Sequence, residues 1–249
     1  MISFVVPAHN EEHLLGATLD AIYASAHDLN SPFEVVVVDD ASTDATAAIA
    51  AGRGATVLTV SLRQIAAVRN AGAFASRGEF LIFVDADTLV NTAVVRAAVA
   101  AMNAGAVGGG ANVMWDGRLP VWAHALASIT LWTMWLGNWA AGCFVFCTRE
   151  SFEQTGGFDP HLYATEEIGF SRALNRRGRF VLLRETVTTS GRKLRTHGAG
   201  ELLRMAAALS VRGLAGLRDR RSLPLWYGER RHEEHETEPE NTKKSKSRR

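Results

Sequence analysis

Short apolar runs alternate with helix-like segments along most of the chain, and this alternation limits the possible folds more than any other feature. Residues 2–6, 33–38 and 80–84 are short runs rich in valine, isoleucine and phenylalanine, as expected of strands in a covered sheet. Between the first two runs, apolar residues such as Leu15 and Leu19 recur at helical spacing. The alternation predicts an α/β fold, a Rossmann-like wound mixed sheet flanked by helices.

The other segments continue the pattern. The expected helices are an alanine-rich one that ends near Gly52, then residues 65–77 with Gly78 as the stop signal, 94–102 and 166–177. The expected strands are residues 55–60, 106–113, 143–147 and 180–183. Asn10 is the expected cap of the first helix. We therefore predict a single domain over residues 1–200.

Beyond residue 200 the composition changes. Residues 201–227 combine apolar side chains such as Leu202 and Leu209 with arginines such as Arg212 and Arg218. This pattern predicts a basic amphipathic helix, which either rests on an anionic membrane surface or packs on the domain. Residues 228–249 carry blocks of charge and almost nothing apolar, so a disordered tail is expected there.

The composition excludes several classes of protein. Of the 249 residues 47% are hydrophobic and 21% charged, which argues against wholesale disorder, and a net charge of +1 gives no sign of a nucleic-acid binder. Two cysteines are too few for a disulfide scaffold, and Cys143 and Cys147 lie too far apart along an expected strand to bond each other. The start of the sequence has no basic leader, so a cytoplasmic location is expected.

Residues 119–148 are unusual because they contain no Asp, Glu, Lys or Arg and hold four of the six tryptophans. Their number meets the crude length criterion for a membrane span, but Pro120, Gly137, Asn138 and Gly142 interrupt the run. Three arrangements remain open: a span, a helix lying in the membrane interface, or a buried helix followed by a loop and a core strand.

Acidic residues follow three of the expected strands. Glu11 and Glu12 come after the first, Asp39 and Asp40 follow the second, and the sequence DAD at 85–87 follows the fourth. In an open parallel sheet these strand ends are where ligands bind. Crowded carboxylates repel one another unless a cation lies among them, and Mg²⁺ or Mn²⁺ prefers oxygen ligands. Neither a GxxxxGK[ST] loop nor a GxGxxG after the first strand is present, so any phosphate is held by metal and side chains.

Five segments occur in an order and spacing that resemble family 2 glycosyltransferases. They are VVPAHNEE, VVVVDDASTDAT, AVRNAG, FVDADT and GGFDPHLYATEEIGFSRAL, which together cover about residues 1–200. The resemblance implies a GT-A fold and a nucleoside-diphosphate sugar donor of UDP or GDP type. Because no QxxRW signature follows the expected base, it also implies transfer of one sugar per encounter.

The resemblance assigns roles by position. The loop from Pro7 to Glu11, including His9, is expected against the base and ribose, and Asp40, supported by Asp39, is expected to bind the base. Arg69 is expected near the nucleotide. Asp85 and Asp87 match the metal motif, with Asp87 as the stronger direct ligand; the plainer alternative is a capping turn after a strand.

The segment ATEEIGF matches the part of the family that carries the general base. Many members have Glu-Asp where this chain has Glu166 and Glu167, so Glu167 is the expected base and Glu166 its neighbour. The longer side chain could still reach an acceptor hydroxyl. The structural alternative is that both carboxylates favour the positive start of the following helix.

The segment SGRKLRTHG is the third expected site. His197 is a candidate metal ligand that would complete the set begun by Asp85 and Asp87. Its neighbours Arg192, Lys193 and Arg195 are expected to hold the diphosphate, unless they form a solvated basic loop.

The sequence therefore favours a metal-dependent inverting sugar transferase at the inner face of the cell membrane. Its acceptor is expected to be lipid-linked or amphiphilic, because of the tryptophan-rich and basic segments. One alternative is a nucleotidyltransferase that makes a sugar nucleotide, which would need a glycine-rich basic loop after the first strand. The other is a non-catalytic sugar-nucleotide binder, which retained nucleotide binding without turnover would reveal.

Overall fold

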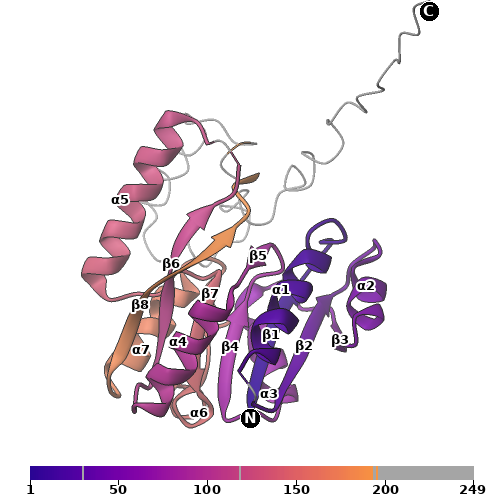
Figure 1. Cartoon of the computed structure of the whole chain (residues 1–249), viewed down its shortest axis with the longest axis horizontal. Coiled ribbons are helices and arrows are strands. Elements are labelled where there is room, and N and C mark those ends of the chain that lie inside the picture. Colours follow the sequence, from indigo (N-terminus) through magenta and orange to yellow (C-terminus); the bar gives the residue numbers. More distant parts are fainter. Residues whose placement is uncertain (30, 118, 193–194, 196–249) are drawn as a thin grey trace, which may run out of the picture.

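Eight strands form one mixed sheet in the order β3-β2-β1-β4-β7-β6-β8-β5 (Figure 1). The structure is a computed structural model that describes residues 1–29, 31–117, 119–192 and 195. The strands are β1 Ile2–Ala8, β2 Phe33–Asp40, β3 Thr56–Val60, β4 Phe80–Val84, β5 Thr88–Leu89, β6 Gly108–Trp115, β7 Phe144–Thr148 and β8 Phe180–Thr189. The helices are α1 Leu15–His27, α2 Thr46–Gly52, α3 Ile65–Ala75, α4 Thr92–Asn103, α5 Val121–Gly137, α6 Arg149–Thr155 and α7 Glu166–Asn175.

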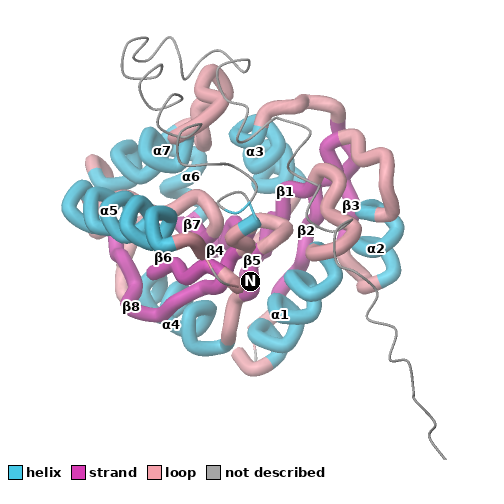
Figure 2. The backbone as a smooth tube through the Cα atoms, turned by 90° about the horizontal axis from the view of Figure 1, so that it is seen from above, coloured by secondary structure: helices cyan, strands magenta, loops and turns pink. Residues whose placement is uncertain are grey.

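The first four strands of the sheet, β3, β2, β1 and β4, are mutually parallel, whereas β7 runs antiparallel to both of its neighbours. Helices α1, α2 and α4 cover one face, and α3, α6 and α7 cover the other (Figure 2). This two-sided cover explains the continuous apolar runs, because alternate residues of each strand enter opposite cores. The α/β fold class predicted from the sequence is confirmed.

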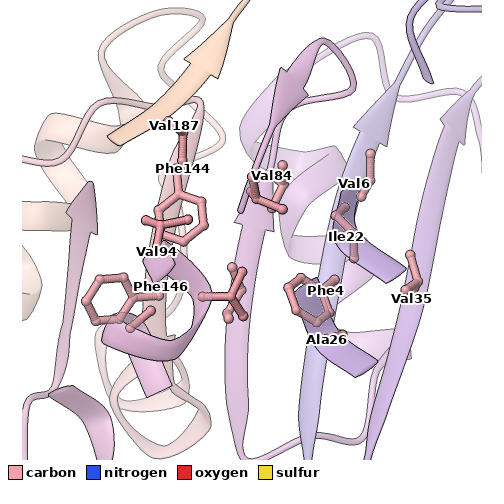
Figure 3. Packing of buried hydrophobic residues seen from close by; sticks show 14 of the residues in the cluster. Phe4, Val6, Ile22, Ala26, Val35, Val84, Val94, Phe144, Phe146 and Val187 are labelled. Atoms are coloured by element: carbon pink, nitrogen blue, oxygen red, sulfur yellow. The ribbon is translucent and has the colours of Figure 1, made fainter. Parts of the chain in front are cut away.

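The larger core lies between the sheet and helices α1 and α4 (Figure 3). Phe4 and Val6 of β1 pack with Ile22 of α1, and Phe144 and Phe146 of β7 fill the space beneath α4. All five side chains are fully buried. This packing fixes the strand ends that carry the acidic residues.

Several expected boundaries were wrong by a few residues. Helix α1 begins at Leu15 without a side-chain cap; Asn10 instead has a φ of 53° and its side chain accepts a hydrogen bond from the Thr43 N–H at 2.8 Å. Helix α3 stops at Ala75, before Gly78, and α7 stops at Asn175. Strand β8 continues to Thr189, because its second half pairs in parallel with β6 beyond a bulge. Neither β5, of two residues, nor α6, of seven, was expected.

The uncharged segment forms α5, a loop and the core strand β7; of the three arrangements left open, the one with a buried helix was wrong about the helix. Of its 17 residues, only Ala123 and Ala127 are buried. The helix is apolar nearly all round, so its hydropathy could not show which face meets the domain. Among the described residues, no helix combines the length and apolarity needed to cross a membrane. The segment 201–227 and the tail 228–249 lie outside the described residues, so the predictions for both stay predictions.

Candidate functional site

The expected site lies at the carboxyl edge of the parallel strands. Strands β1 and β2 end together, with Ala8 paired to Asp39, and β4 runs parallel beside β1. Asp85 follows β4 directly, and its N–H donates to the carbonyl of Cys143 at 3.1 Å, just before β7. Residues distant in sequence therefore meet at one edge of the sheet, as the strand order of an open α/β fold requires.

Arg69 of α3 joins the metal motif to the expected base motif. Its Nη1 donates to Glu166 Oε1 at 2.6 Å, and its Nη2 donates to Asp85 Oδ1 at 2.8 Å and to the Gly142 carbonyl at 2.9 Å. The guanidinium is 2% exposed. Burial would lower the pKa of Arg69, but the charges of Asp85 and Glu166 outweigh burial and raise it, so the cation is permanent. One buried cation thus balances two carboxylates from different motifs.

Glu167 lies beside this pair in the first turn of α7 and remains partly exposed. Burial, followed by the charge of Glu166, raises the pKa of Glu167 to about 8, although Arg69 opposes the change. Its carboxyl group faces the backbone at Gly142, where an added Cβ would lie 3.5 Å from Glu167 Cδ. A carboxyl group with a pKa near 8 is, once ionised, a stronger base than an ordinary glutamate and can accept a proton during a reaction.

Arg192, which follows β8, forms a second buried network. Its Nη2 donates to both oxygens of Glu11 at 2.6 and 2.7 Å and to Asp87 Oδ2 at 3.2 Å. Glu11 and Asp87 raise the pKa of Arg192 against the opposing effect of burial. The chain returns here because Ser190 donates its N–H to the Asp87 carbonyl at 3.1 Å. The structure therefore brings three predicted site residues together, with Arg192 paired to carboxylates.

The turns after β1, β2 and β3 form a third group. Asp40 Oδ1 accepts from the N–H groups of Leu62 and Arg63 at 2.7 and 3.1 Å, and Asp39 Oδ1 accepts from the Ser42 N–H at 3.2 Å. Arg63 Nη1 lies 2.6 Å from Nε2 of His9. Pro7 is buried within β1, opposite Val38, because that strand runs on to Ala8.

Backbone strain accompanies this group. Asn10, Ala41 and Arg63 all have positive φ angles, of 52° or 53°, although none is a glycine. Such conformations cost of order 1–3 kcal/mol each and collect at functional sites. They mark the edge formed by β1, β2 and β3 as a candidate ligand site.

The sequence patterns did not indicate Arg63, nor two side chains at and within α3 that hold the segment between α6 and α7. Asn70 binds the backbone of Phe158 twice, donating to its carbonyl at 2.8 Å and accepting from its N–H at 2.9 Å. Gln64 donates to the carbonyl of Leu162. Asn70 directly follows Arg69 in the motif AVRNAG, which could have drawn attention to it, but only the fold shows which groups its amide binds.

Asp85 and Asp87 are the residues that could hold a metal ion. Mg²⁺ and Mn²⁺ accept one or two carboxylates and complete their coordination with water and substrate phosphates, so the hard oxygen donors of these two carboxylates, each with one oxygen bonded to an arginine, suit such an ion. The described part of the chain contains no group of three or more His, Cys, Asp or Glu side chains placed to bind a metal. His197 and Lys193 lie outside the described residues. Arg195 donates to the Asp116 carbonyl at 2.9 Å, in the turn after β6.

The comparisons with known proteins agree with this architecture. A sequence model described as glycosyl transferase family 2 matches residues 3–156, more than half of the chain. The chain belongs to this family. The matched residues include all three strand ends with acidic residues and stop before Glu166 and Glu167.

Among curated family relatives, the chain is 35% identical over 99 residues to the mouse dolichyl-phosphate beta-glucosyltransferase, a match that covers 34% of this chain and 31% of that protein. It is 39% identical over 95 residues to undecaprenyl-phosphate 4-deoxy-4-formamido-L-arabinose transferase of Pseudomonas aeruginosa, covering 35% of this chain and 28% of the relative. The chain therefore spans about a third of the length of the curated relatives it matches.

Solved structures share the fold. A mannosyltransferase from Pyrobaculum calidifontis, in complex with GDP-Man and Mn²⁺, aligns with a TM-score of 0.64 at 20% identity, covering 92% of this chain and 68% of that one. Glucosyl-3-phosphoglycerate synthase from Mycobacterium tuberculosis, in complex with Mn²⁺ and UDP, aligns at 0.58 with 22% identity, covering 84% and 79%. The GT-A fold expected from the resemblance is confirmed.

Proposed function

We propose that this protein is an inverting, non-processive glycosyltransferase. It moves a sugar from a nucleoside-diphosphate sugar of UDP or GDP type to an acceptor, with Mn²⁺ or Mg²⁺ as cofactor. The observation that carries the proposal is the Arg69 network, because one buried guanidinium binds Asp85 of the metal motif and Glu166 beside the base. The complexes of two structural relatives, with GDP-Man and Mn²⁺ and with UDP and Mn²⁺, support this donor class and this metal.

Glu167 is the general base of the proposed reaction. The acceptor oxygen forms a bond to the anomeric carbon while its proton passes to the Glu167 carboxylate. The bond from that carbon to the diphosphate breaks on the opposite face, so the configuration inverts. A carboxyl group whose pKa is raised to about 8 is a stronger proton acceptor than an ordinary glutamate, which suits a hydroxyl acceptor.

Asp85 and Asp87 hold the metal ion, which when bound neutralises the charge of the departing diphosphate as a Lewis acid. Arg192 keeps Asp87 in place and balances the buried Glu11. Lys193 and Arg195 remain proposed partners of the diphosphate, and His197 a proposed third ligand.

Asp40 and Arg63 recognise the base in this proposal. Asp40 Oδ1 already accepts two backbone N–H groups, so its second oxygen is the acceptor for an N–H of the base. Arg63 beside His9 adds donors that suit the carbonyl oxygens of uracil or guanine. Pro7 and Asp39 shape the same strand ends.

The acceptor is lipid-linked or amphiphilic, and the enzyme works from the cytoplasm at the inner face of the cell membrane. The support is that the relatives are named for dolichyl phosphate and undecaprenyl phosphate. A phosphate acceptor would change the role of Glu167, because a phosphate monoester with a second pKa of about 6 is already ionised at neutral pH. Glu167→Gln separates the two cases: turnover should vanish with a hydroxyl acceptor and survive in part with a phosphate.

A thermal-shift panel of nucleoside diphosphates with and without Mn²⁺ tests the proposal. A ligand at about 100 times its Kd stabilises a protein by roughly 2.7 kcal/mol. Asp87→Ala should remove the manganese-dependent part of the shift. Asp20→Ala, on α1, removes only an exposed ion pair with Arg53 and should keep the manganese-dependent part. The proposal fails if no nucleotide shifts the melting temperature in the presence of manganese.

A further inference from the structure

The face of α5 that points away from the domain is apolar along its whole length. The helix packs inward through the buried Ala123 and Ala127 and the partly buried Leu131 and Met134. The opposite stripe, at spacings of four, four, three and four residues, consists of Val121, Ala125, Ile129, Trp132 and Leu136. Its four large side chains are 57–87% exposed, and Trp135 beside them is 67% exposed. A helix on a water-exposed surface normally carries polar residues on its outward face, so this stripe indicates contact with an apolar partner.

The composition of the helix identifies a membrane surface as that partner. No charged residue occurs from 119 to 148, and tryptophan is the residue that collects at the boundary between lipid headgroups and acyl chains. The helix has 17 residues, about 25 Å at 1.5 Å per residue, and does not meet the requirements for crossing a bilayer. A helix that is too short to span, is anchored on the domain along one side and carries tryptophans on its exposed side is suited to lie in the plane of the interface.

Basic residues border the C-terminal end of this stripe. The Arg172 guanidinium lies 4.5 Å from the centre of the Trp139 ring, and Arg176 directly follows Asn175. Asn175 in turn bonds the amide and the carbonyl of Asn138, the C-cap of α5. Both Arg172 and Arg176 are exposed. Arginines beside an apolar stripe complement the negative charge of anionic lipids.

We propose that α5 inserts its outward stripe into the headgroup boundary of an anionic membrane and thereby holds the catalytic edge at that surface. The short loop after α5 is hydrogen-bonded to the catalytic edge. The Ala140 N–H donates to Ser171 Oγ of α7 at 3.0 Å, and the Gly142 carbonyl accepts from Arg69. Helix α7 carries Glu167 in its first turn. A membrane-bound α5 therefore fixes the distance of Glu167 from the lipid surface; this last step rests on the proposed function, whereas the membrane contact does not.

Flotation of the full chain with phosphatidylcholine vesicles, with and without phosphatidylglycerol, tests the proposal without any nucleotide. The parent should float with the anionic vesicles at low salt. Trp132→Glu removes a large apolar side chain from the stripe and adds a negative charge, so its partition coefficient should fall at least tenfold. Ala48→Glu adds the same charge at an exposed position of α2, at the opposite end of the molecule from α5 (Figures 1 and 2), and should float like the parent.

Three outcomes overturn the proposal. The first is a parent that does not float, or a Trp132→Glu variant that floats like the parent. The second is a dimer in sedimentation that Trp132→Glu dissociates, since a second copy would then cover α5. The third is loss of flotation when Arg218, Arg220 and Arg221 become serine while Trp132→Glu still floats, since residues 201–227 would then carry the contact.

The thermal-shift response to UDP or GDP with Mn²⁺, measured on the same samples, keeps the two proposals apart. A normal response without flotation overturns the membrane surface alone. Flotation without any nucleotide response overturns the proposed function alone. A Trp132→Glu variant that keeps both its nucleotide response and its circular dichroism spectrum is folded, so its loss of flotation reports the stripe itself.

Discussion

The two buried arginines set the charge balance of the site residue by residue. Arg69 lies between Asp85 and Glu166, and Arg192 lies between Glu11 and Asp87. Each guanidinium is 3% exposed or less. A buried ion pair adds little net stability, but removal of one partner leaves an uncompensated charge. These arginines are therefore needed to keep four carboxylates close together before any metal ion binds.

Replacement of Arg69 by methionine should destabilise the protein by about 3–5 kcal/mol, because Asp85 and Glu166 would lose their buried counter-charge. For a chain of this size each kcal/mol corresponds to roughly 2–4 °C in melting temperature. Thermal unfolding followed by circular dichroism measures the change. Arg96→Met, at an exposed arginine of α4, is the matched control and should melt near the parent temperature. Equal melting temperatures for the two variants would contradict the charge-balance argument.

Ionised Glu167 should lower the stability of the folded protein while it supports activity. Its pKa is raised in the folded protein, so the folded state binds a proton that the unfolded state has released, and stability falls as pH rises. The loss begins near the unfolded pKa of about 4.3 and levels off near pH 8. Glu167→Gln should therefore gain stability over the parent between these values, and lose turnover with a hydroxyl acceptor.

Melting curves in chelator at several pH values measure this difference. Glu153→Gln, at an exposed glutamate of α6, should show no such trend. In the parent, turnover with a hydroxyl acceptor should rise with pH up to about 8, because the base must be ionised. A stability difference that does not change with pH would argue against a raised pKa.

At the level of elements, α3 organises the site. It packs closely on the sheet at Gly72, where a Cβ would lie 2.4 Å from a methyl group of Val5. From this position its side chains reach the segment between α6 and α7, through Asn70 and Gln64, and the start of α7, through Arg69. The segment between α6 and α7 has no strand of its own, so its placement depends on these contacts.

Asn70→Ala should lower turnover more than nucleotide binding. It leaves the N–H and carbonyl of Phe158 without their partner, at a cost of about 1–3 kcal/mol. Asn70→Asp keeps the acceptor but not the donor, so its turnover should lie between that of the parent and that of Asn70→Ala. The measurements are kcat for an accepted substrate and Kd for the nucleoside diphosphate. Asn103→Ala, at an exposed position of α4, is the control. Equal losses in kcat and in nucleotide affinity would place Asn70 in the nucleotide site instead.

At the scale of the whole molecule, the sheet joins both halves of the domain into one unit. Strand β4 hydrogen-bonds β1 on one side and β7 on the other, and β6 then pairs with both β7 and β8. The strands that end in acidic residues and the strands beside α5 therefore share a continuous ladder. Every described helix and strand packs in the sheet or against it, and only α5 leaves a broad apolar face uncovered.

Unfolding should consequently be a single transition for the described domain. Tryptophan fluorescence reports mainly the α5 side, where four of the six tryptophans lie, whereas circular dichroism reports the whole sheet. In urea the two midpoints should coincide, as two-state unfolding requires. An earlier fluorescence transition would show that α5 and its neighbours unfold independently of β1, β2 and β4.

The sequence alone determined the α/β class, the positions of most strands and the motifs of the family, because apolar periodicity and turn residues act locally. It placed Asp85, Asp87 and Arg192 in one site through the resemblance, and the structure brings Asp87 and Arg192 within hydrogen-bonding distance. Only the tertiary structure decided that Arg69 holds Asp85 to Glu166, that Arg192 balances Glu11, and that Asn70 anchors Phe158. These pairings join residues far apart in the chain, and no local pattern encodes them. The exposure of α5 was decided in the same way, since a helix that is apolar nearly all round leaves the choice of buried face to the surrounding fold.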